Sequence, residues 1–190
     1  MSAWIARKRP LSGLLAAALA VAVAAVIVIG VVYVKAPRAT RVHVGDMAPD
    51  FELPVVTDPK PAKLSGNRGG PTLLVFFDSR WPGSDAYIRY LERMHRRYFR
   101  RGLRTMAVAV DRDPALVREF VRRNGVTFAV VSDPFAGQLV SSWGTPKDPE
   151  AYLLDPVLRV EAVLLERVDW TSPKVRDFLA KYLQPGPPGY

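Results

Sequence analysis

The chain has 190 residues, of which 49% are hydrophobic and 24% charged, and it contains 17 prolines, two histidines and no cysteine. This length accommodates one ordinary domain and an additional segment. Without cysteine, the chain forms no disulfide and supplies neither a thiolate nucleophile nor a sulfur ligand for zinc. Disulfide scaffolds, zinc knuckles and dithiol redox chemistry carried by this chain are therefore excluded.

The formal net charge of +9 is concentrated near the amino terminus. Residues 1–41 contain six basic and no acidic residues, which leaves 21 basic and 18 acidic residues in 42–190. The remaining part is only mildly basic, so we expect no nucleic-acid partner.

An apolar run without Asp, Glu, Lys or Arg occupies residues 11–34, after a short basic tail at 1–10. Its 24 residues would span roughly 36 Å as a helix, enough for a hydrocarbon core of about 30 Å. We expect an uncleaved transmembrane helix that contacts membrane lipid. The alternative is a cleaved signal peptide, whose apolar region is usually about 7–15 residues long. The basic cluster at residues 7–9 favours an amino terminus inside the cell and a domain on the periplasmic or cell-surface side.

After a tether at 35–43, a single α/β domain is predicted over 44–183, followed by a flexible tail at 184–190. Short apolar runs bounded by Gly, Pro or Asp are typical of buried strands. Four such runs alternate with helical patterns: Leu73–Phe77, Thr105–Val110, Phe128–Val131 and Tyr152–Leu154. The alternation predicts a central mixed sheet flanked by helices.

The clearest predicted helix runs from Ser84 to Arg101 and has an apolar face and an arginine face. We interpret His95, on the apolar face, as a packed core residue rather than a metal ligand. The arginine face is interpreted as solvated, with anionic lipid heads or an acidic partner as the alternative. The apolar face comprises Tyr87, Ile88, Leu91, Met94, His95, Tyr98 and Phe99.

Two more helices are predicted from their start signals. The first begins with Asp113 as N-cap and Pro114 at the first helical position, and it ends at Asn124-Gly125. The other begins at Ser172-Pro173. Its apolar side comprises Val175, Phe178, Leu179 and Tyr182.

Several motifs follow one another in a specific order along the domain. They are Val44–Leu53 (VGDMAPDFEL), Leu64-Ser65, Gly69–Pro71, Gly102-Leu103, Phe128–Asp133, Trp143-Gly144 and Pro149–Asp155. Together they resemble the redoxin group, which includes AhpC/TSA-related peroxiredoxins and membrane-anchored thioredoxin-like proteins of the TlpA and ResA kind. The resemblance implies a thioredoxin-like fold, in agreement with the pattern of predicted elements.

The active-site motif departs from that family. The family's first central strand leads into Phe-Trp-x-x-Trp-Cys-x-x-Cys, whereas Phe76–Ser84 reads FFDSRWPGS, with Trp81 and Ser84 at the cysteine positions. Dithiol exchange needs one thiolate to attack and a second to resolve the mixed disulfide. We therefore expect no catalytic residue, no cofactor and no metal here, although the family's activity is thiol-disulfide exchange or peroxide reduction.

The residues at these positions each have two interpretations. Ser84 is interpreted as a helix cap rather than a nucleophile, which would need a base such as Asp78 or Asp85. Trp81 is either a binding anchor or packed against the loop at Pro149. The resemblance places Pro149 where the family has a cis-proline, and Asp111 and Asp155 are expected to cap or turn the chain.

Two functional hypotheses remain open. The first is a membrane-tethered, extracytoplasmic domain without redox activity that binds a protein or peptide through the degenerate active-site face. The second is an oxidoreductase or antioxidant family member that acts only with a cysteine-bearing partner, or an enzyme with non-thiol chemistry. The expected binding residues are Trp81, Pro82, Gly83, Ser84, Asp148, Pro149 and Glu150.

Overall fold

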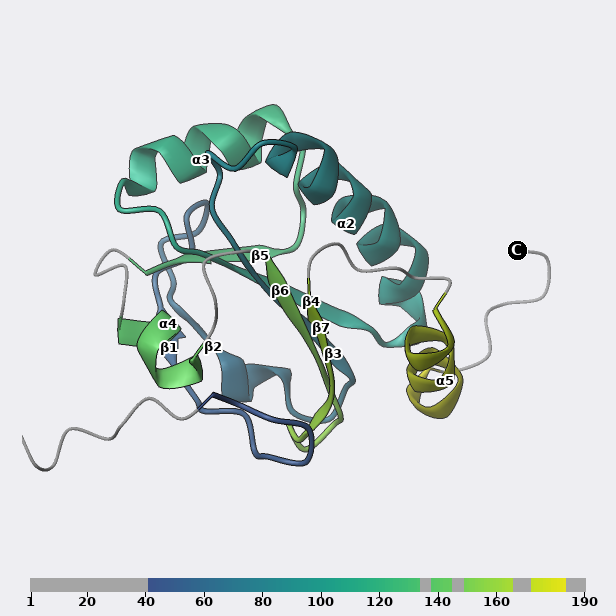
Figure 1. Cartoon of the computed structure of the whole chain (residues 1–190). Helices are drawn as coiled ribbons and strands as arrows, with labels where there is room; N and C mark the ends of the chain where they lie inside the picture. Colours follow the sequence, from purple (N-terminus) through teal and green to yellow (C-terminus); the bar gives the residue numbers. More distant parts are fainter. Residues whose placement is uncertain (1–40, 134–137, 145–148, 166–171, 184–190) are drawn as a thin grey trace, which may run out of the picture. The chain divides into compact units, whose positions relative to one another are not determined.

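The computed structural model describes residues 41–133, 138–144, 149–165 and 172–183 (Figure 1). They contain a five-stranded sheet in the order β5-β4-β3-β6-β7, in which β3, β4 and β5 are parallel and β6 and β7 are antiparallel to their neighbours. The predicted mixed sheet is therefore confirmed. Its strands are β3 (Thr72–Phe77), β4 (Arg104–Ala109), β5 (Ala129–Ser132), β6 (Glu150–Leu154) and β7 (Val160–Leu165).

Strand β3 lies at the centre of the sheet and is buried along its whole length. Successive side chains of a strand point to opposite faces, so this continuous apolar run contributes to two core clusters. Leu73, Val75 and Phe77 belong to one cluster, and Leu74 and Phe76 to the other. Both faces of the sheet are thus covered, as is usual for parallel strands.

Helices α2 (Ser84–Tyr98), α3 (Pro114–Arg123) and α5 (Pro173–Tyr182) contribute apolar side chains to the first cluster. Helix α4 (Gln138–Trp143) contributes to the second, and Figure 1 shows α2 and α3 on one side of the sheet and α4 on the other. The second cluster also includes Leu64 of the 3-10 helix η1 (Leu64–Asn67). A two-stranded sheet of β1 (Glu52–Leu53) and β2 (Ala62–Lys63) precedes η1.

The local signals of the three predicted helices are largely confirmed. The Asp113 side chain accepts a hydrogen bond from the Ala115 N–H, and α3 ends before Asn124, as expected. The first predicted helix, however, ends three residues early. The chain continues from Tyr98 as the 3-10 helix η2 (Phe99–Arg101), so its periodicity changes and Phe99 is 59% exposed rather than on the apolar face.

None of the helices within the described ranges is long and apolar enough to cross a bilayer. The predicted membrane span, 11–34, lies outside those ranges, as do the basic tail and the carboxyl-terminal tail. The described chain begins with the last residues of the predicted tether. There the Val42 side chain is buried, and its N–H donates to the carbonyl oxygen of Trp143.

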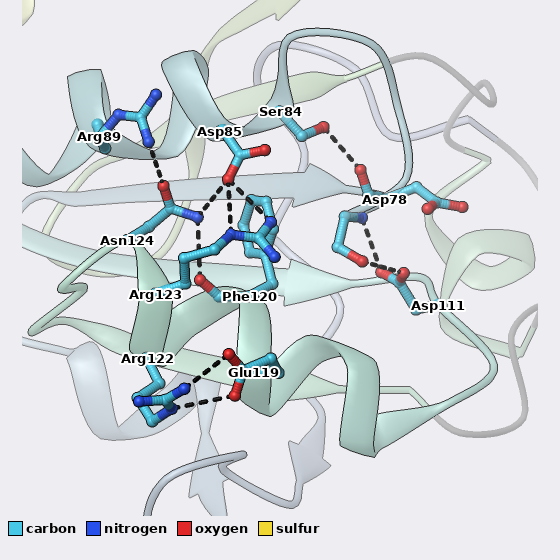
Figure 2. A network of polar contacts seen from close by, with 11 residues as sticks. Asp78, Ser84, Asp85, Arg89, Asp111, Glu119, Phe120, Arg122, Arg123 and Asn124 are labelled. Carbon is cyan, nitrogen blue, oxygen red and sulfur yellow. Dashed lines mark hydrogen bonds and ion pairs between the residues drawn. The ribbon is translucent and has the colours of Figure 1, made fainter.

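A polar network joins the start of α2 to the end of α3 (Figure 2). The side-chain amide of Asn124 donates to the Asp85 carboxylate at 2.7 Å and to the Phe120 carbonyl at 2.9 Å. Its oxygen accepts from the Arg89 guanidinium at 2.7 Å, and Arg123 also donates to Asp85. Asn124 is buried, so these bonds hold both helices in place above the sheet.

We expect Asn124→Ala to lower the free energy of unfolding by about 1–3 kcal/mol, because it leaves buried polar partners unsatisfied. Arg122→Ala is the matched control on the same helix, since it breaks only an exposed pair with Glu119, and should cost about 0.5 kcal/mol or less. Urea unfolding of the full chain measures both values. Equal losses in the two variants would contradict the assigned role of the network.

Candidate functional site

The loop between β3 and α2, residues 78–83, lies at the carboxyl end of the central strand. Its first residue, Asp78, has a carboxylate that accepts from the Arg80 main-chain N–H at 2.8 Å and from the Arg80 guanidinium at 2.9 and 2.6 Å. The Asp78 carbonyl accepts from the Trp81 N–H and from the Ser84 hydroxyl. Asp78 therefore holds Arg80, Trp81 and Ser84 in place.

A second carboxylate holds the same loop from the neighbouring strand. Asp111 follows β4, and because β3 and β4 are parallel, their carboxyl ends meet at one edge of the sheet. The Asp111 carboxylate accepts from the Ser79 N–H at 3.0 Å and from the Ser79 hydroxyl at 2.5 Å (Figure 2). Asp111 is 1% exposed. It was expected to cap or turn the chain, and in the structure it fixes residue 79 through these two hydrogen bonds.

The pKa values of the two carboxyl groups are shifted in opposite directions. The Arg80 guanidinium lowers the pKa of Asp78, against the opposing effect of burial. Burial raises the pKa of Asp111, and the nearby Asp78 charge raises it further, although the hydrogen bonds from Ser79 oppose the shift. The pair therefore favours an ionised Asp78 and a more weakly acidic Asp111.

The two residues at the family's cysteine positions are presented differently. Trp81 is half-buried and packs against the larger core cluster, and Pro82 and Gly83 beside it are exposed. Ser84 is buried as the first residue of α2. The Ser84 N–H donates to the Trp81 carbonyl at 3.1 Å, which closes a tight turn.

The interpretation of Ser84 as a helix cap is wrong. The N-cap is Gly83, at φ 88°, a left-handed conformation that glycine adopts at little cost. The Ser84 hydroxyl instead donates to the Asp78 carbonyl at 2.8 Å. Asp85, one of the two candidate bases, bonds to Asn124 and Arg123, and these bonds lower its pKa. Nothing in this arrangement activates Ser84 as a nucleophile.

The other half of the predicted face lies at the start of β6. Glu150 pairs with Phe76 across the sheet, so Pro149 precedes the strand at the same edge as the loop. Glu150 itself is fully buried and accepts from the Arg41 guanidinium at 2.9 Å, so its side chain does not lie on an exposed binding face. Asp148 lies outside the described residues, and with it the peptide bond whose cis conformation was expected at Pro149.

His95 is a packed residue, as expected. Its ring lies 5.1 Å from that of Phe99 and 5.5 Å from that of Phe128, measured between centroids, and burial lowers its pKa. Within the described ranges there is no group of three or more His, Asp or Glu side chains placed to hold a metal ion.

Sequence reasoning missed the roles of Asp78 and Arg80. The available signal was the position of Asp78 and Asp111, each close after a buried apolar run, because parallel strands bring such residues to one edge. The loop sequence does not reveal that Arg80 turns back onto Asp78. Only the geometry shows that the loop is held by ionic and hydrogen bonds in a chain that contains no thiol.

We expect Asp111→Asn to change the dependence of stability on pH. A carboxyl whose pKa is raised on folding contributes stability below its ordinary pKa of about 3.9, and this contribution is lost as the pH rises through the raised value. Compared with wild type, the variant should therefore become relatively more stable between about pH 4 and pH 7. Urea unfolding across this range measures the difference.

Ser79→Ala is the control, because it removes a hydrogen bond to Asp111 and leaves the titrating carboxyl in place. It should retain the wild-type direction of pH dependence. Parallel stability curves for Asp111→Asn and wild type would show that Asp111 titrates normally.

Comparisons with known proteins agree with the observed fold. Residues 44–163 match the model of the AhpC/TSA family. Thiol-disulfide oxidoreductase ResA of Geobacillus kaustophilus is 29% identical over 127 residues, covering 66% of this chain and 71% of that protein, and ResA of Geobacillus thermodenitrificans is 27% identical over 125 residues.

Two solved structures show the same fold. A Chlorobium tepidum protein assigned as thiol:disulfide interchange protein DsbE matches 74% of this chain and 97% of its own with a TM-score of 0.66 and 24% identity. Peroxidoxin BcpB of Mycobacterium tuberculosis matches 74% and 96% with a TM-score of 0.62 and 18% identity. The fold is thioredoxin-like, and the chain is a cysteine-free member of the AhpC/TSA redoxin family.

Proposed function

We propose that this chain is a membrane-tethered, extracytoplasmic redoxin domain that binds a protein or peptide through the loop at residues 78–84 and the adjoining start of β6. The observation that carries the proposal is the construction of this loop. Asp78, Arg80 and Asp111 hold it in a defined conformation although it contains no thiol, and such order suits a preformed recognition surface.

The chemistry of the loop favours an extended peptide or a protein segment. Trp81 offers a half-buried aromatic ring, and the adjacent Pro82 and Gly83 are exposed. Aromatic residues held in place by packing are typical binding anchors. Because Arg80 pairs with Asp78, the loop presents no uncompensated carboxylate there, and we infer contacts that are mainly apolar and main-chain.

The tether rests on the uncharged run at 11–34, whose length suits a bilayer span. An anchor on the membrane keeps a binding domain near partners of the cell envelope. The alternative, an oxidoreductase that acts only with a cysteine-bearing partner, uses the same surface but requires the partner to supply both thiols.

Restoring the missing cysteines tests whether this loop is the former active site. Trp81 and Ser84 end the turn closed by the Ser84 N–H, and the Cα atoms across such a turn lie within about 7 Å. A disulfide requires a separation of about 4.4–6.8 Å. We therefore expect the double variant Trp81→Cys, Ser84→Cys to form an intramolecular disulfide under mild oxidant, with the first thiol titrating below the free value of about 8.5.

Thiol counting after oxidation measures this, once circular dichroism has shown that the variant is folded. The wild-type chain is the matched control and should neither reduce insulin disulfides nor consume hydroperoxide with a dithiothreitol supply. A folded double variant that keeps two free thiols would show that these residues do not occupy the cysteine positions. Turnover by the wild type would contradict the proposed absence of redox activity.

Site-specific photocrosslinking tests the binding face. A photoreactive residue at exposed Pro82 should yield discrete crosslinked species in intact cells, and Trp81→Ala should reduce their yield several-fold because it removes the anchor. The matched control position is Val157, which is 52% exposed in the turn after β6, at the opposite end of the sheet. Equal crosslinking from both positions, or no effect of Trp81→Ala, would contradict the proposal.

A further inference from the structure

A second concave site lies at the opposite end of the parallel strands from the loop at residues 78–83. A cavity of about 1290 Å³ is lined by the end of α2, by η2 and by residues at the starts of β4 and β5. The loop at 78–83 follows the carboxyl end of β3, whereas this cavity lies at the amino ends of the parallel strands. The two sites are therefore separate.

The lining of the cavity is strongly basic. Among the residues that the structure describes, none of its lining side chains is acidic. Arg96 pairs with Glu92 at 2.5 Å, but Arg97 and Arg100 have no carboxylate within 4.0 Å in the described ranges. The lining arginines are Arg96, Arg97, Arg100, Arg101 and Arg104.

The partial charge at the end of α2 does not account for this number of cations. A helix carboxyl terminus carries the equivalent of about half a negative charge, which a single guanidinium balances. Additional arginines at this end repel one another, although solvent and salt screen this repulsion between exposed side chains. Arg96, Arg97 and Arg100 are exposed, in agreement with a solvated arginine face, and the cavity gathers their charge in one place.

Buried polar groups in the wall lack partners. Thr105 is 7% exposed, and its hydroxyl makes no hydrogen bond within the described part of the chain. The side-chain nitrogen of Asn67 is likewise buried without a partner there, and both residues line the cavity. Buried polar atoms without partners are rare, but neither atom is accessible to solvent, so a ligand in the cavity does not reach them in this conformation.

Arg104 contacts the main chain beside the cavity. Its guanidinium donates to the Gly66 carbonyl at 3.3 Å. A Cβ atom at Gly70 would come within 2.7 Å of its Nε, so a larger residue at position 70 would displace this side chain. Arg104 is exposed and lines the cavity.

The cavity also has an aromatic wall. Phe99 is 59% exposed, and it packs beside His95, which in turn contacts Phe128. Burial lowers the pKa of His95, so at neutral pH this ring provides a flat surface rather than a charge. Guanidinium groups and aromatic rings together suit a ligand with an anionic part and an apolar part.

We propose that this cavity binds a phosphate group carried on an apolar or aromatic molecule, with Arg97, Arg100 and Arg104 contacting the phosphate. Arginine forks bind phosphate oxygens in pairs. A phospholipid head group and a soluble phosphate ester share this chemistry. The site is independent of the proposed binding function of the loop at residues 78–84.

Phenyl phosphate is the probe, titrated calorimetrically into the full chain in a maltoside detergent that contains no phosphate. We expect saturable binding with one site per chain. Arg97→Ala and Arg100→Ala should each weaken it by about tenfold, since each removes a charge-assisted hydrogen bond. Arg93→Ala is the matched control, because Arg93 lies on the same arginine face of α2 but does not line the cavity, and it should change the affinity less than twofold.

The same titration in phosphatidylglycerol nanodiscs distinguishes the two sources of the phosphate. Loss of phenyl phosphate binding there identifies the lipid head group as the occupant, and unchanged binding identifies a soluble ester. Absence of saturable binding in the maltoside detergent would overturn the proposal. An equal loss of affinity in Arg93→Ala and Arg100→Ala would also overturn it, because binding would then depend on total charge rather than on the cavity.

Discussion

The burial of β3 on both faces is the constraint on which the other elements depend. Because its six residues are all inaccessible, helices must cover both sides of the sheet, and β4 and β6 must satisfy its main-chain groups on either edge. The chain leaves this strand at Asp78, which is itself buried and needs a charge partner. Arg80 supplies that partner, so the conformation of the exposed loop follows from the burial of the strand.

Four short apolar runs were sufficient to predict β3, β4, β5 and β6, because a buried strand needs little more than continuous apolar sequence between turn residues. Strand β7 was not predicted, since an acidic residue interrupts the apolar run of its sequence VEAVLL. Helix α4 has only six residues, too few for a periodicity to be read. Phe99 was misplaced because an ideal helical period does not anticipate the change to a 3-10 helix after Tyr98.

The sequence predicted where the site lies, but not which contacts hold its residues or which of them are buried. The motif register placed Trp81, Pro82 and Ser84 at the start of α2, where the structure has them. It did not predict that Gly83 is the N-cap, since this depends on a positive φ that the chain adopts in context. Nor did it predict that Glu150 is buried, because a charged residue at a strand start is exposed unless a partner such as Arg41 covers it.

Because the chain has no cysteine, no thiolate has to be stabilised at the carboxyl ends of the parallel strands. A thiolate there is stabilised by the helix amino terminus, whereas a hydroxyl and an indole gain nothing comparable from that field. In this chain the polar groups at the edge are used instead to hold the backbone, through Asp78, Asp111 and the Ser84 hydroxyl. Uncompensated positive charge lies instead at the opposite edge, at the end of α2. The ordered loop and the basic cavity lie at opposite ends of the parallel strands, so in the proposed functions neither site relies on the electrostatics of the other.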